Sequence, residues 1–290
     1  MQDPVLSFQT RVTQILIVFL VTAAGLAFSP VALAQAGAVK PGAVKLEWLT
    51  WSFFRFTTPG GKVILTNPFI TGNPDAAAGV KLEEIAKADL ILVPDGHGDE
   101  IGDTVAIAKA TGARIVTPFE LGSWFVSQGV PEAQVMRRNP GGRFAWEGIT
   151  IRVVGSVHGS GSGSDMPSKR APIYGGAAAG FMVTFENGYT VYFPGSSAAT
   201  QDMALWAEAY KPDAMIFLMH GSGEPQDIGM AVKLVAGKSP NLKMLTPHHH
   251  RVSPPPGAPT VAEVRSVLDS MGIRIPITAL APKQSIELSK

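Results

Sequence analysis

The stretch VPDGHGDEIGD, residues 93–103, sets His97 among three acids, Asp95, Asp99 and Glu100. An apolar run precedes it and a helix-like segment follows. Imidazole and carboxylate groups bind divalent cations, and acid-rich sets favour harder ions such as Mn²⁺ or Mg²⁺ over Zn²⁺. The stretch therefore indicates a metal-binding loop.

A helix cap is the alternative explanation for part of this loop. Asp99 or Asp103 precedes the helix-like segment GDTVAIAKATG, where an Asp side chain commonly accepts a hydrogen bond from a free backbone N–H. Capping accounts for one acid. It does not account for three acids and a histidine packed into DGHGDE.

All six histidines of the chain follow apolar, strand-like runs. They come after DLILVP, ITIRVVGSV, DAMIFLM and LKMLTP, as His97, His158, His220, His248, His249 and His250. Loops that leave the carboxyl ends of strands gather in one crevice in α/β proteins, and ligands bind there. A single histidine in such a place is more often structural, but the shared position predicts a common site.

Apolar runs of strand length recur along the chain and alternate with helical patterns. The predicted strands are 45–56, 62–67, 89–94, 113–118, 149–157, 180–186, 189–194, 213–219 and 242–247. The predicted helices are 82–88, 102–112, 203–210, 228–237 and 260–272. We expect mainly β-hairpins in the first half of the chain and mainly alternating strands and helices in the second half. The mixture predicts an α/β (α+β) fold of two packed sheets with helices outside.

The N-terminal segment differs from the rest. A 14-residue apolar run, ILIVFLVTAAGLAF, is followed by Ala32 and Ala34 in an A-x-A arrangement. Because a membrane span needs about 20 residues, the pattern favours a signal peptide over residues 1–34. An uncleaved N-terminal anchor is the alternative. We expect a flexible leader at 35–44, a single domain at 45–290, and a periplasmic or secreted protein without stable membrane association.

Composition narrows the partners. The chain has 290 residues, 46% of them hydrophobic and 16% charged, with a formal net charge of +1 and no cysteine. A hydrophobic, nearly neutral chain without runs of Lys or Arg is not expected to bind nucleic acid. The expected partner is a small-molecule substrate, and the sequence does not predict an oligomeric state.

Residues 159–178, GSGSGSDMPSKRAPIYGGAA, form one long segment without a periodic pattern. Long loops in compact domains are commonly lids or binding loops. Lys169, Arg170 and Tyr174 are therefore candidate substrate contacts. A plain surface insertion is an equally good explanation.

Several motifs occur in a fixed order along the chain. LTNPFITGNP comes first, then DGHGDE, a histidine before a Ser/Gly-rich loop, YFPGSS, and Pro247-His248-His249. Over nearly all of 45–290 this series resembles the metallo-β-lactamase-fold hydrolases, particularly the ascorbate-6-phosphate lactonase branch. The resemblance implies a four-layer αββα sandwich.

The resemblance also implies one or two divalent metal ions (Mn, Zn or Fe) and two sets of ligands. One set is Asp95, His97 and His158, and the other is Asp99, Glu100 and His249. Of the three consecutive histidines, the spacing favours His249 as the ligand.

Five positions depart from the family pattern. Asp95 and Glu100 replace histidines, Ser196 replaces a bridging aspartate, Trp51 a histidine and Asn67 an aspartate. Acids remain competent ligands, so metal binding is still expected. A neutral serine cannot bridge two cations as a carboxylate does, so one metal and two metals both remain open.

The predicted function is an exported metal-dependent hydrolase, in which a metal-activated water attacks a lactone, an ester or a phosphoester. Asp99 or Glu100 would orient the nucleophile, His220 would protonate the leaving group, and Ser196 would contact the substrate. For His220 a structural bond to backbone is the simpler explanation. The alternative function is a catalytically degenerate protein that binds a metal or small ligand, and lyase or redox chemistry at Mn or Fe is a third.

Overall fold

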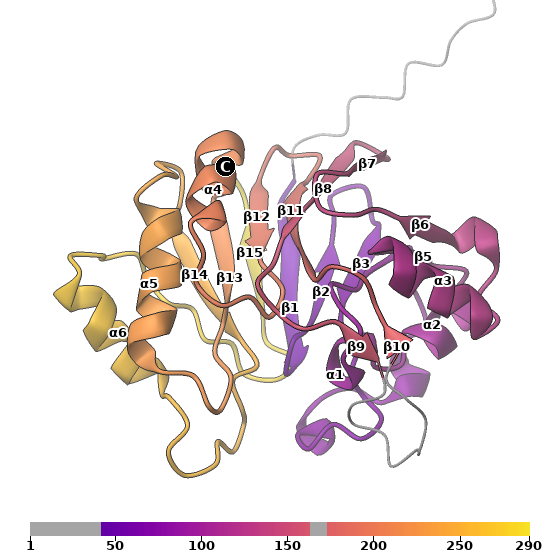
Figure 1. The fold of residues 1–290 in the computed structure, drawn as a ribbon, viewed down its shortest axis with the longest axis horizontal. Coiled ribbons are helices and arrows are strands. Elements are labelled where there is room, and N and C mark those ends of the chain that lie inside the picture. The colour runs from indigo at the N-terminus through magenta and orange to yellow at the C-terminus, as the bar shows by residue number, and fades with distance from the viewer. Residues whose placement is uncertain (1–41, 163–172) are drawn as a thin grey trace, which may run out of the picture. The chain divides into compact units, whose positions relative to one another are not determined.

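The computed structural model describes residues 42–162 and 173–290, which form two sheets flanked by helices (Figure 1). The predicted signal peptide, most of the predicted leader, Lys169 and Arg170 lie outside the described residues. No helix within the described ranges is long and apolar enough to cross a membrane.

The first sheet has seven strands in the order β15-β1-β2-β3-β4-β5-β6. In that order they span Ser285–Leu288, Val44–Thr50, Phe53–Thr57, Val63–Thr66, Leu90–Leu92, Arg114–Thr117 and Val135–Arg137. Strands β15, β1, β2 and β3 pair antiparallel, and β3 to β6 pair parallel.

The second sheet has six strands in the order β14-β13-β12-β11-β8-β7. In that order they span Met244–His248, Ala214–Leu218, Thr190–Phe193, Ala179–Thr184, Ile149–Gly155 and Arg143–Trp146. Strands β7, β8, β11 and β12 pair antiparallel, and β12, β13 and β14 pair parallel. The expectation of hairpins in one half and alternation in the other is therefore wrong, because each half contains both. A short hairpin of β9 (Gly161–Ser162) and β10 (Ile173–Tyr174) stands apart.

Six α-helices occur in the described parts of the chain. They are α1 (Gly98–Ile101), α2 (Thr104–Thr111), α3 (Phe119–Ser127), α4 (Asp202–Tyr210), α5 (Pro225–Ala236) and α6 (Val261–Ser270). Short 3₁₀ turns span Ala76–Ala78, Leu82–Glu84 and Glu132–Gln134. The predicted helix 82–88 is only one of these turns. Helix α3, FELGSWFVS, has no counterpart among the predicted helices, although its buried residues Leu121 and Phe125 have the i, i+4 spacing of one helical face.

Three apolar layers separate the sheets and helices, and alternation along each strand creates them. On β11, Phe181 and Val183 pack between the two sheets, whereas Met182 faces α4, α5 and α6. On β4, Leu92 joins the same inter-sheet core and Ile91 faces the helices of the first sheet. The result is helix, sheet, sheet, helix, which confirms the predicted αββα sandwich.

The end of the chain completes the first sheet. Strand β15 pairs with β1, with Val44 opposite Leu288. Two residues further, the Lys290 ammonium donates to the buried carboxylate of Asp213, which also accepts from the backbone N–H of Thr190. Residues 285–290 therefore complete the first sheet and contact Asp213, the residue that precedes β13 of the second sheet.

Candidate metal centre

The polar side chains singled out in the sequence meet at one edge of the sandwich. Asp95 follows β4, His158 follows β8, Ser196 follows β12, His220 follows β13, and His249 follows β14. A cavity of about 440 Å³ opens at this edge, and we call it the site cavity. Its wall includes Trp51, His97, Asp99, Glu100, Val157, His158, Ser196, Ala198, Leu218, His220, Ser222 and His249.

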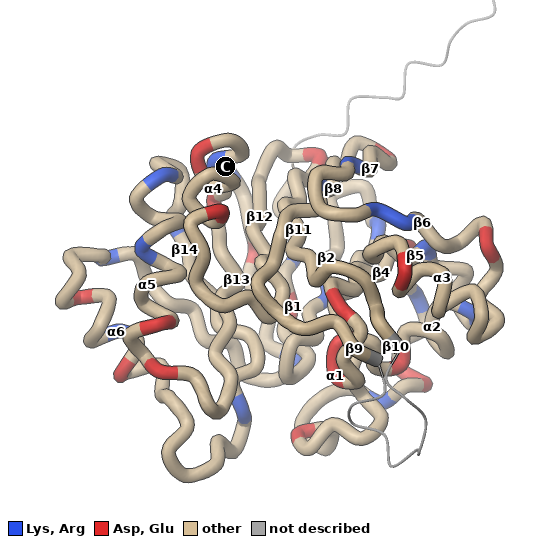
Figure 2. Tube along the Cα trace, in the orientation of Figure 1, with Lys and Arg blue, Asp and Glu red and all other residues tan. Residues whose placement is uncertain are grey.

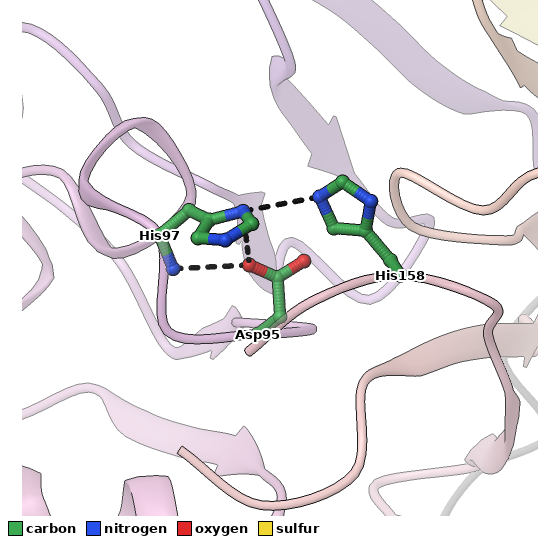
Figure 3. A group of neighbouring side chains, drawn as sticks. All are labelled: Asp95, His97 and His158. Atoms are coloured by element: carbon green, nitrogen blue, oxygen red, sulfur yellow. Dashed lines mark hydrogen bonds and ion pairs between the residues drawn. The ribbon is translucent and has the colours of Figure 1, made fainter. Parts of the chain in front are cut away.

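Asp95, His97 and His158 form a tight group of donor atoms, here called the triad (Figure 3). One ligand atom from each lies within 4.8 Å of the other two. His97 Nδ1 is 3.0 Å from His158 Nε2 and 3.5 Å from Asp95 Oδ1. Among the residues that the structure describes, this is the one group of three such side chains.

Asp95 shows that a cation fits the triad. Its side chain is fully buried, Oδ1 accepts the backbone N–H of His97 at 3.0 Å, and Oδ2 has no hydrogen-bond partner. Burial raises the pKa of Asp95 to about 7, although the backbone bond and the charge of His97 oppose the rise. A buried carboxylate without a compensating charge is costly, and a cation removes that cost.

The two imidazoles of the triad reach the cavity from different layers. His97 is the residue that precedes α1, with extended backbone, and His158 lies on an exposed loop after β8. Burial of the ring and the charge of His97 lower the pKa of His158 to about 4. His158 is therefore neutral at pH 7, which is the form that binds metal.

Asp99 and His249 form the first part of a second set. Asp99 Oδ2 accepts the indole N–H of Trp51 at 2.8 Å and lies 3.1 Å from His249 Nε2. Burial acts to raise the pKa of Asp99, but the hydrogen bond and charge of His249 and the bond from Trp51 outweigh it and lower the pKa to about 2. Trp51 therefore supplies a donor to Asp99, a role that the sequence did not reveal.

Glu100 completes this set. It is fully buried, and its Oε1 accepts the hydroxyl proton of Ser196 and lies 3.6 Å from His249 Nε2. Burial, with the charges of Asp95 and Asp99, raises the pKa of Glu100 well above its ordinary value. We call Asp99, Glu100 and His249 the hydrogen-bonded set, because a protein donor occupies one oxygen of each carboxylate, although Glu100 Oε2 is buried and has no partner.

The three consecutive histidines have different surroundings. His249 lines the site cavity, with backbone φ of +58° and its N–H donated to the carbonyl of Trp51. His248 is buried, with Nδ1 2.8 Å from His249 Nδ1. His250 stacks on Trp48 with ring centroids 3.9 Å apart. The structure thus brings His249, and neither neighbour, to the cavity wall.

His220 also lines the site cavity. Its Nδ1 accepts the backbone N–H of Ser222 at 3.2 Å, so the ring proton of the neutral imidazole is on Nε2. Burial lowers the pKa of His220, and the charge of His249 adds to the effect. The bond to backbone agrees with the structural explanation, and the Nε2 proton also leaves a donor role open.

Some predicted contacts are not part of the cavity wall. Tyr174 is 68% exposed on β10 and is not among the residues that line the site cavity. The capping explanation is wrong for both acids. Asp103 Oδ2 accepts the backbone N–H groups of Ile70 and Thr71 instead, and Asp99 binds Trp51 and His249.

Comparison with known proteins assigns the class and then the family. Residues 62–246 match the model of a beta-lactamase superfamily domain, which confirms the predicted metallo-β-lactamase fold. A UPF0173 metal-dependent hydrolase from Thermodesulfovibrio yellowstonii is 35% identical over 221 residues, 73% of this chain and 80% of that protein. Another, from Rubrobacter xylanophilus, is 31% identical over 248 residues, 84% of this chain and 97% of that one. The chain belongs to the UPF0173 family of the beta-lactamase superfamily.

A solved structure agrees on the fold. Igni18, described as a metallo hydrolase from Ignicoccus hospitalis, superposes with a TM-score of 0.70 at 23% identity, over 86% of this chain and all of that one (100%). The narrower resemblance to the ascorbate-6-phosphate lactonase branch is not confirmed by these comparisons.

Proposed function

We propose that this protein is a hydrolase of uncharged carboxylic esters or lactones, and that one divalent cation bound by the triad activates water. The main support for this proposal is that ligand atoms of Asp95, His97 and His158 lie close together, and that Asp95 Oδ2 is buried without a hydrogen-bond partner. The family name of the relatives, metal-dependent hydrolase, supports the same assignment.

The donor types suit Mn²⁺, Fe²⁺ or Zn²⁺, with the mixed carboxylate and imidazole set favouring the first two. A divalent cation supplies Lewis acidity and makes water a nucleophile near neutral pH. Asp95 and the two histidines hold the cation. Asp99 is ionised, and Trp51 and His249 fix the position of its Oδ2, so that it can orient a water molecule in the cavity.

The side chains that line the cavity favour an uncharged substrate. Asp99 on its wall is ionised, and none of the described residues that line it is Lys or Arg. The tube view shows acidic residues on α1 (Figure 2). Phosphoryl groups are usually bound by Arg, Lys or backbone N–H clusters, so a carbonyl substrate is favoured over a phosphoester.

His220 would complete the reaction. Its Nε2 carries the proton, and the side chain lies on the wall that also holds Ser222. A hydrogen bond donated from Nε2 would stabilise the departing alkoxide, which would take its proton from a water molecule. We further propose that the protein is exported, on the pattern of residues 1–34 alone.

Elemental analysis and ester hydrolysis test the proposal together. The purified protein, without added metal, should contain close to one equivalent of Mn, Fe or Zn, and His158→Ala should contain none. p-Nitrophenyl butyrate and a γ-lactone should be hydrolysed by the parent and not by the variant. Bis-p-nitrophenyl phosphate should be a poorer substrate.

The alternative is a non-catalytic protein that binds metal or a small ligand. It is favoured by the replacement of a bridging carboxylate with Ser196, whose hydroxyl binds Glu100. Stoichiometric metal without turnover of any ester, lactone or phosphoester would establish this alternative. Equal turnover in the parent and in His158→Ala would exclude metal-dependent catalysis.

A further inference from the structure

A second hollow, here called the side cavity, adjoins the site cavity. Its volume is about 430 Å³. The two cavities share Ala198, Leu218, His220 and Ser222 on their walls. A molecule with its reactive group at the triad can therefore extend past His220 into the side cavity.

The inner wall of the side cavity is apolar. It lies between the second sheet and its helices, with contributions from α4, β13 and α5. Six of its apolar side chains are Met203, Met215, Phe217, Ile228, Met230 and Ala231. Three of the six are methionines, whose flexible side chains adapt to the shape of an apolar guest.

The polar side chains of this cavity limit what can bind there. Glu224 and Asp227 are exposed residues on its wall, and no described residue lining it is Lys or Arg. These carboxylates repel an anionic group at the far end of a ligand. The geometry suits a chain that is apolar and uncharged over its whole length.

We propose that the side cavity binds the acyl chain of the substrate, so that the protein prefers esters or lactones of medium-length, uncharged acyl groups. This inference rests on the proposed hydrolysis of esters or lactones. Each methylene that enters the cavity should raise kcat/KM about fourfold, the equivalent of roughly 0.8 kcal/mol of buried CH₂.

The activity test uses p-nitrophenyl esters from acetate to octanoate with the metal-loaded protein. The expected result is a rise in kcat/KM of roughly 60-fold, corresponding to about three buried methylenes. Ala231→Phe fills the cavity from α5, so it should abolish the rise in kcat/KM from acetate to octanoate. Ala209→Phe is the matched control, because Ala209 is exposed on α4 and lines neither cavity.

A second measurement does not depend on turnover. Methyl-¹³C methionine NMR of His158→Ala would be recorded with ethyl octanoate and with ethyl acetate. Ethyl octanoate should shift the methyl signals of Met203, Met215 and Met230. The signals of Met182 and Met244, which do not line the side cavity, should remain in place.

The outcomes separate the two proposals. The side-cavity inference would be overturned if esters were hydrolysed without a preference for chain length, or if ethyl octanoate did not shift the methyl signals of Met203, Met215 and Met230. The proposed hydrolase function would still stand in the first case. Methionine shifts without hydrolysis of any ester would support the side cavity and overturn the proposed function. If Ala231→Phe does not fold, the NMR result on His158→Ala decides the question.

Discussion

One loop supplies residues to two sets of polar side chains that differ in how their atoms are satisfied. In the triad, His97 and His158 face each other, and Asp95 Oδ2 has no partner. In the hydrogen-bonded set, Asp99 binds Trp51 and His249, and Glu100 binds Ser196. The two sets contain the same residue types in nearly the same number.

If the triad binds the cation as proposed, this difference separates a metal site from ligand-type side chains that mainly bind one another. A cation needs lone pairs that the protein has left unoccupied, and burial that makes their desolvation costly without it. The triad meets both conditions, and its donor atoms lie within 4.8 Å of one another. In the hydrogen-bonded set Trp51 donates to Asp99 Oδ2 and Ser196 to Glu100 Oε1, so Glu100 Oε2 is the buried oxygen that remains without a partner there.

Removal of the triad's charge should have the largest effect. Asp95→Asn keeps the shape of the side chain but removes the ionised carboxylate, so bound metal should fall from one equivalent to background and kcat/KM by more than about 100-fold. Elemental analysis and ester hydrolysis measure the two effects. Asp103→Asn, the same change in the same loop, should leave both unchanged. Full metal occupancy in Asp95→Asn would mean that the ion is bound elsewhere.

The contributions of Asp95 and Asp99 to the free energy of unfolding should change with pH in opposite directions. The pKa of Asp95 is raised to about 7, so in metal-free protein its contribution to stability is present below pH 4 and is lost as pH rises toward 7. The difference in unfolding free energy between the parent and Asp95→Asn should fall by up to about 4 kcal/mol over this range. Urea unfolding in a chelator measures it, and added Mn²⁺ should remove the loss.

Asp99 is the internal control for this titration. Its pKa is lowered to about 2, so its contribution is present above pH 4 and is lost as pH falls toward 2. The difference in unfolding free energy between the parent and Asp99→Asn should shrink by about 2 kcal/mol as the pH falls from 4 toward 2. It should stay constant from pH 4 to 7. If this difference in unfolding free energy changed with pH in the same way for Asp95→Asn and Asp99→Asn, the distinction between the two sets would be contradicted.

Ser196→Asp tests whether the hydrogen-bonded set can be converted into a metal site. The new carboxylate would stand beside buried Glu100, so metal-free protein should lose about 3 kcal/mol of unfolding free energy. Mn²⁺ should restore stability, raise bound metal from one equivalent to two, and raise hydrolytic activity. Ser196→Ala, which removes the hydroxyl without adding charge, should keep one equivalent. Two equivalents of bound metal in the unaltered protein would mean that the hydrogen-bonded set already binds metal, which would contradict the distinction between the two sets.

Trp51→Phe should have the smallest effect. It removes the N–H donated to Asp99 but keeps an aromatic ring, so kcat/KM should fall about tenfold while metal content stays at one equivalent. Trp206→Phe is the matched control, because the Trp206 indole N–H has no hydrogen-bond partner. Loss of metal from Trp51→Phe would place Asp99 among the ligands.

The layered fold and the composition of the site were largely predictable from the sequence. Continuous apolar runs such as AGFMVT of β11, mixed with helical patterns, predict packed sheets covered by helices, and the position of every histidine after an apolar run predicts one common edge. These signals are local. Helix α3 was missed even though Leu121 and Phe125 carry such a local signal, the i, i+4 spacing of a buried helical face.

The state of the site was less predictable. Whether Asp99 is free or hydrogen-bonded depends on Trp51, 48 residues away in the chain, and Glu100 depends on Ser196, 96 residues away. Sequence spacing does not report such contacts. For the same reason the side cavity was not predicted, since its walls combine α4, β13 and α5.

The pairing of β15 with β1 affects how the protein can be made. Strand β1 is among the first described residues to be synthesised and β15 among the last, so β1 has one open edge until β15 has been synthesised. Open edges recruit strands from other chains. A chain that stops a few residues early, or carries a bulky C-terminal fusion after Lys290, should aggregate more readily than one extended at its N-terminus.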